Sequence, residues 1–351
     1  MVKYLKKKLI LIFEKLSLNK FIRDETAKPL FYNNEKYNIF TFKEFIKLKE
    51  KKKFYIIRRS PGAGMFSNVT FILNKIRFAE KYKLIPIVDM YNFTTIYNEK
   101  EKILSSKNSW EYYFTKLNKY SLFEVYKNKK YYICENNLKG DFSLDIRNNK
   151  INKFFKYIKI KKYLLKKATK FIKKNFNKKE KILGVHFRGT TYKIAQKHAF
   201  PPTIKIMVSH VKKLIRDYNY DKIFISTEEQ EYLDVFKKEF KNLCLYTHSF
   251  RTKKIDAFDI YPRKNHRYLL GKEIIIDTLA LSNCDGLTFV KSNVSSAAIS
   301  LKKKSMHIHE INLGYNSSNI FIARWLWYLK SILPQFFFGL KIIKKKNIFI
   351  K

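Results

Sequence analysis

The sequence predicts an α/β fold made of two Rossmann-like domains, and three observations point to it. Short apolar runs with strand character alternate with longer stretches of helical periodicity in both halves of the chain. A strand, glycine loop, helix and strand follow one another over residues 54–89, and an apolar run at 182–185 ends in His-Phe-Arg. With 351 residues, 46% of them hydrophobic, the chain can build two ordinary cores, and global disorder is excluded.

The first Rossmann-like domain is expected over residues 51–180. Residues 54–57 form a short β-rich run, residues 69–82 have the apolar spacing of a helix, and residues 84–89 read as a second strand. The loop between strand and helix carries Gly62, Ala63 and Gly64, and glycines there let a ligand approach the backbone at a helix N-terminus. The loop is neither a P-loop nor GxGxxG, so it is a weak indication of a nucleotide or sugar-phosphate site. A Lys-rich helix over 154–176 ends this half.

The second domain is expected over residues 181–310. Its first strand runs into His186 and Arg188, which are two residues apart and so lie on one face of the strand end. Ligands bind beyond the carboxyl ends of parallel strands, and the planar fork of Arg suits a phosphate. A local ion pair of Arg188 is the alternative. Further strands beginning at 222, 243 and 286, with helices over 204–218, 232–240 and 273–282, indicate a doubly wound parallel sheet.

Two other strands of this half also end in polar residues. The strand that begins at 222 ends in Ser226, Thr227, Glu228 and Glu229. The strand over 286–290 runs into a turn that opens a helix over 297–301, and the polar residues of that turn are Ser292, Asn293, Ser295 and Ser296. Serines at a helix start can simply be N-caps. Three polar strand ends in one half-domain favour a shared binding site instead.

The charge balance points to anionic partners. The chain has 74 Lys+Arg against 29 Asp+Glu, a formal net charge of +45, which suits nucleic acid, an anionic membrane surface or a nucleotide substrate. The dominance of Lys, with scarce Gly and Pro, is also the profile of an A/T-rich genome. Three scattered cysteines, without CxxC, exclude a disulfide framework and a zinc site and fit a reducing cytoplasm.

The two ends of the chain are basic and aromatic. Residues 1–50 form a basic arm whose segment KKKLILIFEKLSL is either an amphipathic helix on a membrane or an ordinary surface helix, and no secretory signal is convincing. Residues 311–351 form a tail that mixes Trp, Phe and Lys. Such a tail either lies at a headgroup interface or forms a helix that packs back on the first domain.

Taken together, the motifs resemble the fucosyltransferase superfamily of the α1,6-fucosyltransferase, NodZ and protein O-fucosyltransferase type. GVHFRGT resembles its HxR motif, ISTEE its second motif, and LALSNCDGLTFVKSNVSS its third, while PGAGMFSN takes the place of its glycine loop. The resemblance covers roughly residues 54–301. It implies a GT-B-like architecture, in which two Rossmann-like domains face each other across a cleft, and GDP-fucose as donor without a metal or another cofactor.

The resemblance also implies roles for residues of this chain. Arg188 would bind the donor β-phosphate and stabilise the leaving GDP, and Asn68 would line the cleft beside it; these two are the expected catalytic residues. The expected donor-binding set is Gly62, Ala63, Gly64, His186, Arg188, Ser226, Thr227, Glu228, Glu229, Ser292, Asn293, Ser295 and Ser296. The sequence departs from many members at Thr191, where they carry an acid.

The expected function is an inverting glycosyltransferase that transfers fucose to a bacterial surface glycan or glycolipid, as in lipopolysaccharide or capsule synthesis. The absence of a DxD motif disfavours a metal-dependent GT-A enzyme. Asp89, Glu273 and Asp277 are candidates for a general base, and each is more easily read as structural. The expected location is the cytoplasm or the inner face of its membrane, with no nucleic-acid partner. The alternatives are another nucleotide sugar, a non-catalytic polysaccharide-assembly protein, and a nucleic-acid-binding protein that lacks any RRM, KH or zinc signature.

Overall fold

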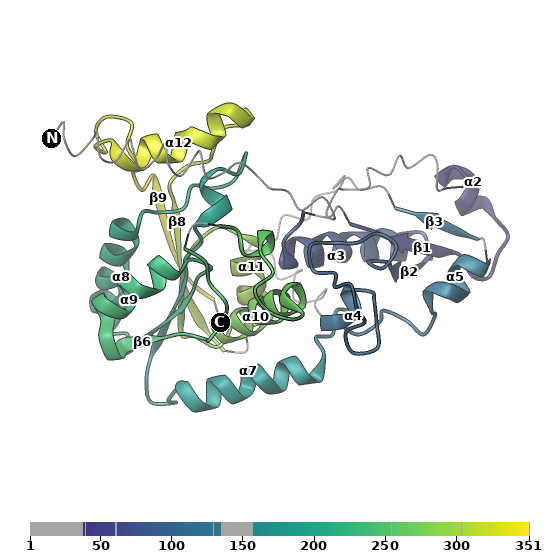
Figure 1. The fold of residues 1–351 in the computed structure, drawn as a ribbon, viewed down its shortest axis with the longest axis horizontal. Coiled ribbons are helices and arrows are strands. Elements are labelled where there is room, and N and C mark those ends of the chain that lie inside the picture. The colour runs from purple at the N-terminus through teal and green to yellow at the C-terminus, as the bar shows by residue number, and fades with distance from the viewer. Residues whose placement is uncertain are drawn as a thin grey trace. The chain divides into compact units, whose positions relative to one another are not determined.

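A computed structural model describes residue 38 and residues 40–59, 62–128, 130–134, 157–253, 255–302 and 304–350 (Figure 1). The chain forms two compact units, and each is described by itself. The C-terminal unit consists of Lys167–Ile260 and Ile276–Lys351. The N-terminal unit consists of the described part of Asp24–Lys166 together with Tyr261–Ile275, a stretch that sequence analysis assigned to the 181–310 domain.

The C-terminal unit is built on a six-stranded sheet with the order β6-β5-β4-β7-β8-β9. The first five strands of that order are parallel, and β9 is antiparallel to β8. The predicted α/β class with parallel strands is therefore confirmed. The strands are β4 (Ile182–His186), β5 (Lys222–Ser226), β6 (Cys244–Leu245), β7 (Gly286–Val290), β8 (Met306–Asn312) and β9 (Lys344–Ile350).

The helices of this unit connect the strands. They are α7 (Lys162–Asn175), α8 (Ile204–Tyr218), α9 (Gln230–Phe240), α10 (His266–Leu281), α11 (Asn293–Ser300) and α12 (Ile320–Ile332), with short 3-10 turns at Thr190–Lys193, Lys241–Leu243 and Ala257–Asp259. By their residue ranges, α7 and α10 contribute to both units. Helix α8 coincides with its predicted range because Thr203 caps its N-terminus and Asn219, in the left-handed conformation, ends it.

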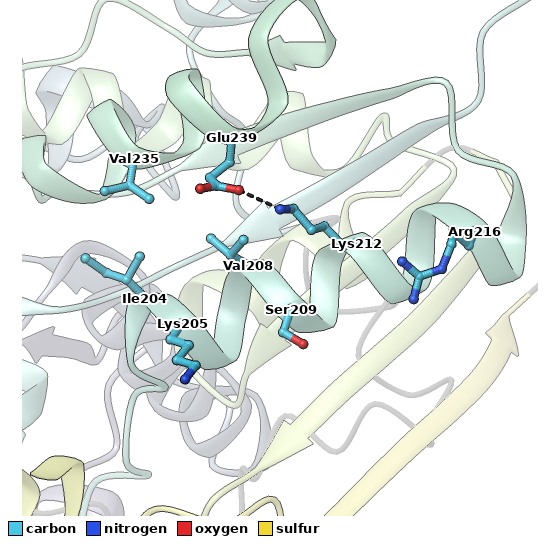
Figure 2. Close-up of a pocket in the computed structure, with 8 residues that line it drawn as sticks. All are labelled: Ile204, Lys205, Val208, Ser209, Lys212, Arg216, Val235 and Glu239. Carbon is cyan, nitrogen blue, oxygen red and sulfur yellow. Dashed lines mark hydrogen bonds and ion pairs between the residues drawn. The ribbon is translucent and has the colours of Figure 1, made fainter.

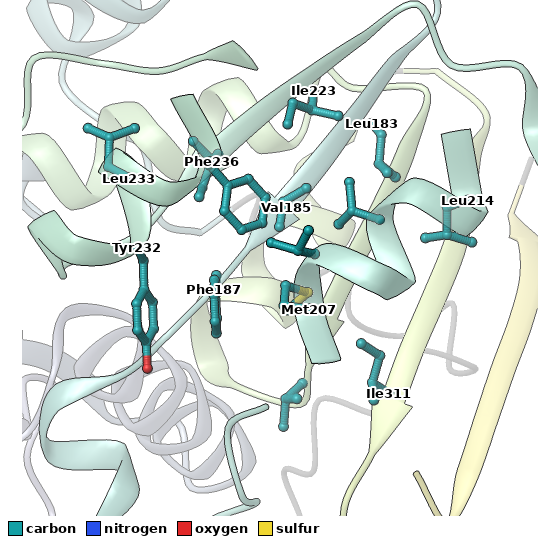
Figure 3. Packing of buried hydrophobic residues seen from close by; sticks show 14 of the residues in the cluster. Leu183, Val185, Phe187, Met207, Leu214, Ile223, Tyr232, Leu233, Phe236 and Ile311 are labelled. Carbon is teal, nitrogen blue, oxygen red and sulfur yellow. The ribbon is translucent and has the colours of Figure 1, made fainter. Parts of the chain in front are cut away.

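The main core of this unit packs α8 and α9 against one face of the sheet (Figure 3). Val185 and Phe187 extend from β4 toward Met207 of α8 and Phe236 of α9, and all four are buried. The Phe187 ring stacks on Tyr232 with centroids 4.0 Å apart. Each such side chain contributes about 1.5–3 kcal/mol on burial, so this packing holds the end of β4 in place.

The opposite face of the sheet receives α10 through a close approach at Gly184. A Cβ at Gly184 would lie 3.1 Å from Leu281 Cδ2 and 3.2 Å from Cys284 Sγ, so glycine lets the helix end approach the strand. Phe224 of β5, on the same face, contacts Phe171 of α7 with ring centroids 5.6 Å apart. All three cysteines are buried and free.

The N-terminal unit contains a parallel three-stranded sheet with the order β2-β1-β3. Its elements are α2 (Phe42–Lys47), β1 (Phe54–Ile57), α3 (Met65–Lys81), β2 (Ile85–Val88), α4 (Trp110–Tyr113), α5 (Leu122–Asn128) and β3 (Tyr131–Ile133). The beginning of α10 packs here because Gly271 lets Tyr113 approach, and Tyr113 stacks on Tyr268 with centroids 5.8 Å apart.

Several elements differ from the sequence expectation. The helix after the glycine loop begins at Met65 rather than near 69, because Gly64 is its N-cap and the apolar spacing becomes regular only later. The expected helix over 297–301 is α11, which begins at Asn293 because Ser292 caps it. The expectation that the tail forms a helix packed on the first domain is wrong: α12 packs in the core of the C-terminal unit through Trp327 and Tyr328, and β9 adds an antiparallel strand to β8 of the same unit. The segment KKKLILIFEKLSL, for which a membrane helix and an ordinary surface helix were the two expectations, lies outside the described part of the chain. No described helix is long and apolar enough to cross a bilayer.

Candidate functional site

The three polar strand ends of the C-terminal unit lie side by side. His186 at the end of β4 is in register with Ser226 of β5 and with Phe289 of β7. Ser292, two residues beyond β7, places its Oγ 3.3 Å from His186 Nδ1. The parallel order of β5, β4 and β7 therefore brings the three predicted segments to one edge, as expected for a site beyond the carboxyl ends of strands.

Arg188 lies just beyond this edge and remains accessible. Its side chain is 33% exposed, its Nε lies 3.5 Å from Glu228 Oε1, and its guanidinium carbon lies 4.3 Å from the centroid of the Tyr192 ring. The Tyr192 ring and the Glu228 carboxylate hold the guanidinium at the edge of the sheet, where its one-third exposed surface can meet an anion. The geometry suits a phosphate ligand, although the ion pair that sequence analysis held as the alternative is also present.

His186 is held neutral in this environment. Burial and, to a smaller extent, the Arg188 charge lower its pKa to about 3, while Glu228 opposes the shift. A neutral imidazole beside Arg188 adds no charge and can still donate or accept one hydrogen bond on its other nitrogen.

Glu228 is the acid that faces Arg188. Burial acts to raise its pKa, but Arg188 and the Gly189 amide, which donates to Glu228 Oε1 at 2.9 Å, outweigh burial and the pKa is lowered. Glu228 is therefore ionised and partly accessible, with the second carboxylate oxygen available to a hydroxyl or N–H donor.

Glu229, the neighbouring predicted ligand, is engaged inside the protein. It is 3% exposed and accepts a hydrogen bond at 2.6 Å from the ammonium of Lys193, itself buried between the rings of Tyr232 and Trp327. The Thr190 amide also donates to it. A Cβ at Gly189 would collide with the Glu229 carboxylate, so only glycine fits there. Glu229 anchors the loop that carries Arg188 rather than facing solvent.

Ser226 and Thr227 are also buried and bonded within the protein. Ser226 Oγ donates to Asp277 at 3.2 Å, and Asp277 accepts from Thr247 at 2.6 Å as well. Thr227 Oγ1 accepts from the Glu229 amide at 3.2 Å. Burial raises the pKa of Asp277, and its hydroxyl partners oppose that shift. These residues stabilise the strand end and the loop after β6.

The first turn of α11 forms the third side of the site. Ser292 Oγ accepts from the Ser295 amide at 3.1 Å, and the Ser292 amide donates to Ser295 Oγ at 3.0 Å, a reciprocal capping box. Ser295 and Ser296 are buried, whereas Asn293 is exposed. The N-cap alternative is thus correct for Ser292, and Ser295 completes the capping box as the N3 residue. The amides of Asn293 and Val294 have no partner within a helix of this geometry, so they can bind an anion.

The glycine loop belongs to the N-terminal unit. A Cβ at Gly62 or Gly64 would meet no described heavy atom within 4 Å, so the loop leaves space beside its backbone. Asn68 is 3% exposed and donates through Nδ2 to the Ala63 carbonyl at 3.2 Å, which closes the loop onto α3. Its Oδ1 is buried with no hydrogen-bond partner among the described residues. This acceptor is available to a ligand donor.

The three candidates for a general base have structural roles. Asp89 accepts from the Asn92 amide at 2.9 Å and from Tyr126 OH at 2.6 Å. Glu273 forms a bidentate ion pair with Arg263 at 2.7 and 2.8 Å, and Asp277 binds the hydroxyls described above. Among the described residues, no cluster of three His, Cys, Asp or Glu side chains could hold a metal ion.

Some residues of this site carried no signal in the sequence. Lys193 is one of 74 basic residues, and only the fold reveals that it pairs with Glu229. Arg251 donates to the Thr227 carbonyl at 3.1 Å and orders the neighbouring loop. Asp256 caps the turn at 257–259; burial raises its pKa, Glu228 adds to the shift and Arg188 opposes it.

Comparisons with known proteins agree with this architecture. No family model matches the sequence, and no curated protein matches it by sequence. Among solved structures, NodZ α1,6-fucosyltransferase soaked with GDP-fucose matches with a TM-score of 0.50 at 14% identity, over 75% of this chain and 96% of that chain. The selenomethionine structure of fucosyltransferase NodZ from Bradyrhizobium matches with a TM-score of 0.50 at 13% identity, over 75% of this chain and 96% of that chain. The chain therefore has the fold of the fucosyltransferase NodZ, and the resemblance found in its motifs is confirmed at the level of the fold.

Proposed function

We propose that this protein is an inverting glycosyltransferase that transfers fucose from GDP-fucose to a bacterial surface glycan or glycolipid. The observation that carries the proposal is the position of Arg188: an accessible guanidinium two residues beyond neutral His186, whose imidazole contacts Ser292, the N-cap of α11. The NodZ structures share this fold, and one of them was soaked with GDP-fucose, which supports the choice of donor.

The proposed chemistry uses these groups on the leaving diphosphate. The acceptor hydroxyl attacks the anomeric carbon, the carbon–oxygen bond to GDP breaks, and the acceptor proton passes to a base. Negative charge develops on the departing phosphate oxygen, where Arg188 and the α11 amides stabilise it without a metal ion. Glu228 holds Arg188 in its orientation, and its second carboxylate oxygen accepts a hydrogen bond from a hydroxyl group of GDP-fucose.

The proposal also covers the acceptor and the cellular location of the enzyme. The net charge of +45 favours association with an anionic membrane surface. We therefore place the enzyme in the cytoplasm, at the inner face of the membrane, where lipid-linked glycans are assembled. Another nucleotide sugar remains the alternative donor because Thr191 stands where related motifs carry an acid.

A thermal-shift panel of GDP-fucose, GDP, UDP-sugars and CMP-sugars tests the donor. A ligand at one hundred times its Kd stabilises the native state by about 2.7 kcal/mol, so GDP and GDP-fucose should raise the melting temperature by several degrees. If only a UDP-sugar raises the melting temperature, the donor is a UDP-sugar and not GDP-fucose. If none of the ligands raises it, the proposed donor site is wrong. Release of free fucose or its transfer in the same samples then distinguishes an enzyme from a binding protein.

A further inference from the structure

Large apolar side chains are exposed on α12 and on the turn that follows it. Phe336 and Phe338 are 91% and 77% exposed, and Phe337, between them, is 58% exposed. On α12, Ile322 and Leu329 are about half exposed and lie seven residues apart, hence on one face of the helix. The opposite face is anchored in the unit, since Ala323, Trp327 and Tyr328 are buried. The helix is thus apolar on its packed face and on an exposed face.

The turn after α12 is an ordered structure that presents its phenylalanines. The Phe337 and Gly339 amides donate to the Pro334 carbonyl at 2.9 and 3.0 Å, and Lys330 Nζ donates to the Phe338 carbonyl at 3.0 Å. Phe338 has a φ of 57°, an unfavourable conformation for a bulky residue. A Cβ at Gly339 would collide with backbone carbonyls of the turn. The backbone therefore holds three consecutive phenylalanines in a conformation that exposes them.

A basic groove adjoins this turn. Its volume is about 490 Å³, and Leu333, Pro334 and Gln335, which lead directly into the phenylalanines, line one side. None of the described residues that line it is Asp or Glu. Its cationic residues come from α8, α12 and β9: Lys205, Lys213, Arg216, Lys330 and Lys345. One of them, Lys213, also pairs with Asp217 at 2.8 Å.

His210 gives this groove a polar group that the protein leaves unsatisfied. It lines the groove and is 6% exposed, and neither ring nitrogen has a hydrogen-bond partner among the described residues. An unsatisfied buried donor is costly, so a phosphate oxygen that accepts from the imidazole would relieve that cost.

A second groove along α8 provides a partial contrast (Figure 2). Lys205 and Arg216 line both grooves, but the second groove also contains Glu239 of α9, which accepts a hydrogen bond from Lys212 at 2.5 Å. Of the two, only the groove beside the phenylalanine turn has no Asp or Glu among its described lining residues.

We propose that the exposed face of α12 and the turn at Phe336–Phe338 dock the protein on an anionic lipid bilayer, with lipid phosphates in the basic groove. The phenylalanines would enter the headgroup region while the lysines contact phosphates, the combination that interfacial segments use. Beside the exposed phenylalanines, the groove is basic and contains His210, whose ring nitrogens have no hydrogen-bond partner among the described residues. This combination favours an anionic bilayer over a neutral protein partner. Donor binding does not require this surface. The docking proposal rests on the proposed function of the protein as an enzyme at a membrane.

Vesicle flotation of the full-length chain without donor tests the surface. The chain should float with phosphatidylglycerol vesicles and much less with phosphatidylcholine vesicles. Phe336→Ser with Phe338→Ser should lower the partition coefficient about tenfold or more, whereas Phe123→Ser, at a phenylalanine of α5 that is also 77% exposed, should change it less than about twofold.

The charge of the groove is tested in the same assay. Lys205→Gln with Lys345→Gln should lower binding to anionic vesicles about tenfold or more. Lys43→Gln with Lys47→Gln removes the same charge from α2 of the other unit and should change binding far less.

Three results would overturn the proposal: full flotation of the phenylalanine variant, equal losses in the matched controls, or a dimer that only the phenylalanine variant disrupts while vesicles are not bound. Protection by GDP-fucose, measured on the same variants, should be unchanged. For the unmodified chain, failure to float with intact protection by GDP-fucose would refute only the docking surface, and absent protection with intact flotation would refute only the proposed donor.

Discussion

Replacement of Arg188 by alanine should remove catalysis while the fold is retained. The side chain is one-third exposed and contributes to stability through a 3.5 Å ion pair and a stacking contact with Tyr192. Exposed ion pairs contribute about 0–1 kcal/mol and exposed cation–π contacts about 0.5–1 kcal/mol. The loss of both should therefore lower the free energy of unfolding by at most about 2 kcal/mol.

The expected effect on turnover is larger than the effect on stability. A preorganised donor to a developing oxyanion contributes about 2.7–4 kcal/mol, so kcat/KM for GDP-fucose should fall by about 10²–10³. Arg188→Lys retains the charge but loses the bidentate fork, so its kcat/KM should lie between those of the unmodified chain and of Arg188→Ala. Arg77→Ala, at an exposed arginine of α3, is the matched control and should retain turnover.

The assay combines release of GDP from GDP-fucose, thermal protection by GDP, and far-UV circular dichroism of each variant. A folded Arg188→Ala protein with turnover within about threefold of the unmodified chain would show that Arg188 does not contact the diphosphate. Equal losses in Arg77→Ala would show that the effect is one of general charge and not of this site.

Three further predictions concern the support of the site. Lys193→Met leaves the Glu229 carboxylate buried without its cation and should lower the free energy of unfolding by about 3–5 kcal/mol in urea titration; a loss below about 1 kcal/mol would mean that water reaches the pair. Gly189→Ala forces a methyl group against Glu229 and should reduce the melting temperature and GDP protection together, whereas retention of both would contradict the close approach. The pKa of His186 is about 3 in the folded chain and about 6.5 in the unfolded chain, so below pH 6.5 the unfolded state binds a proton that the native state does not. Stability should therefore decrease as pH falls from 6.5 toward 3, by up to about 1.4 kcal/mol per pH unit, and His186→Gln should remove that part of the slope; an unchanged slope would mean that His186 is protonated in the native protein.

The strand ends of the C-terminal unit could be predicted because each is a local pattern. A buried apolar run followed by polar residues occurs at His186, Ser226 and Val290, and the parallel order of the sheet brings such ends together. Sequence alone could not divide the polar residues between ligand contacts and structural roles. Glu228 and Glu229 are adjacent in the chain, yet one faces Arg188 and the other is buried against Lys193, 36 residues away in sequence.

Other features depend on contacts between distant segments. The association of Tyr261–Ile275 with the N-terminal unit follows from the packing of Gly271 and Tyr268 on Tyr113, which no local pattern records. The edge strand β9 has a Lys-rich sequence that resembles a solvated tail, and its pairing with β8 is decided by the free edge of the sheet. The basic groove is likewise assembled from three separate elements.

By itself, the sequence determined the α/β class, the alternation of strands and helices, and the strand end that carries Arg188, because hydrophobic periodicity and strand termination are local properties of the chain. Only the tertiary structure decided which carboxylate is accessible, which serines serve as caps, and where basic and apolar side chains gather. Those outcomes depend on burial and pairing between residues far apart in sequence, and burial exists only once the chain has packed.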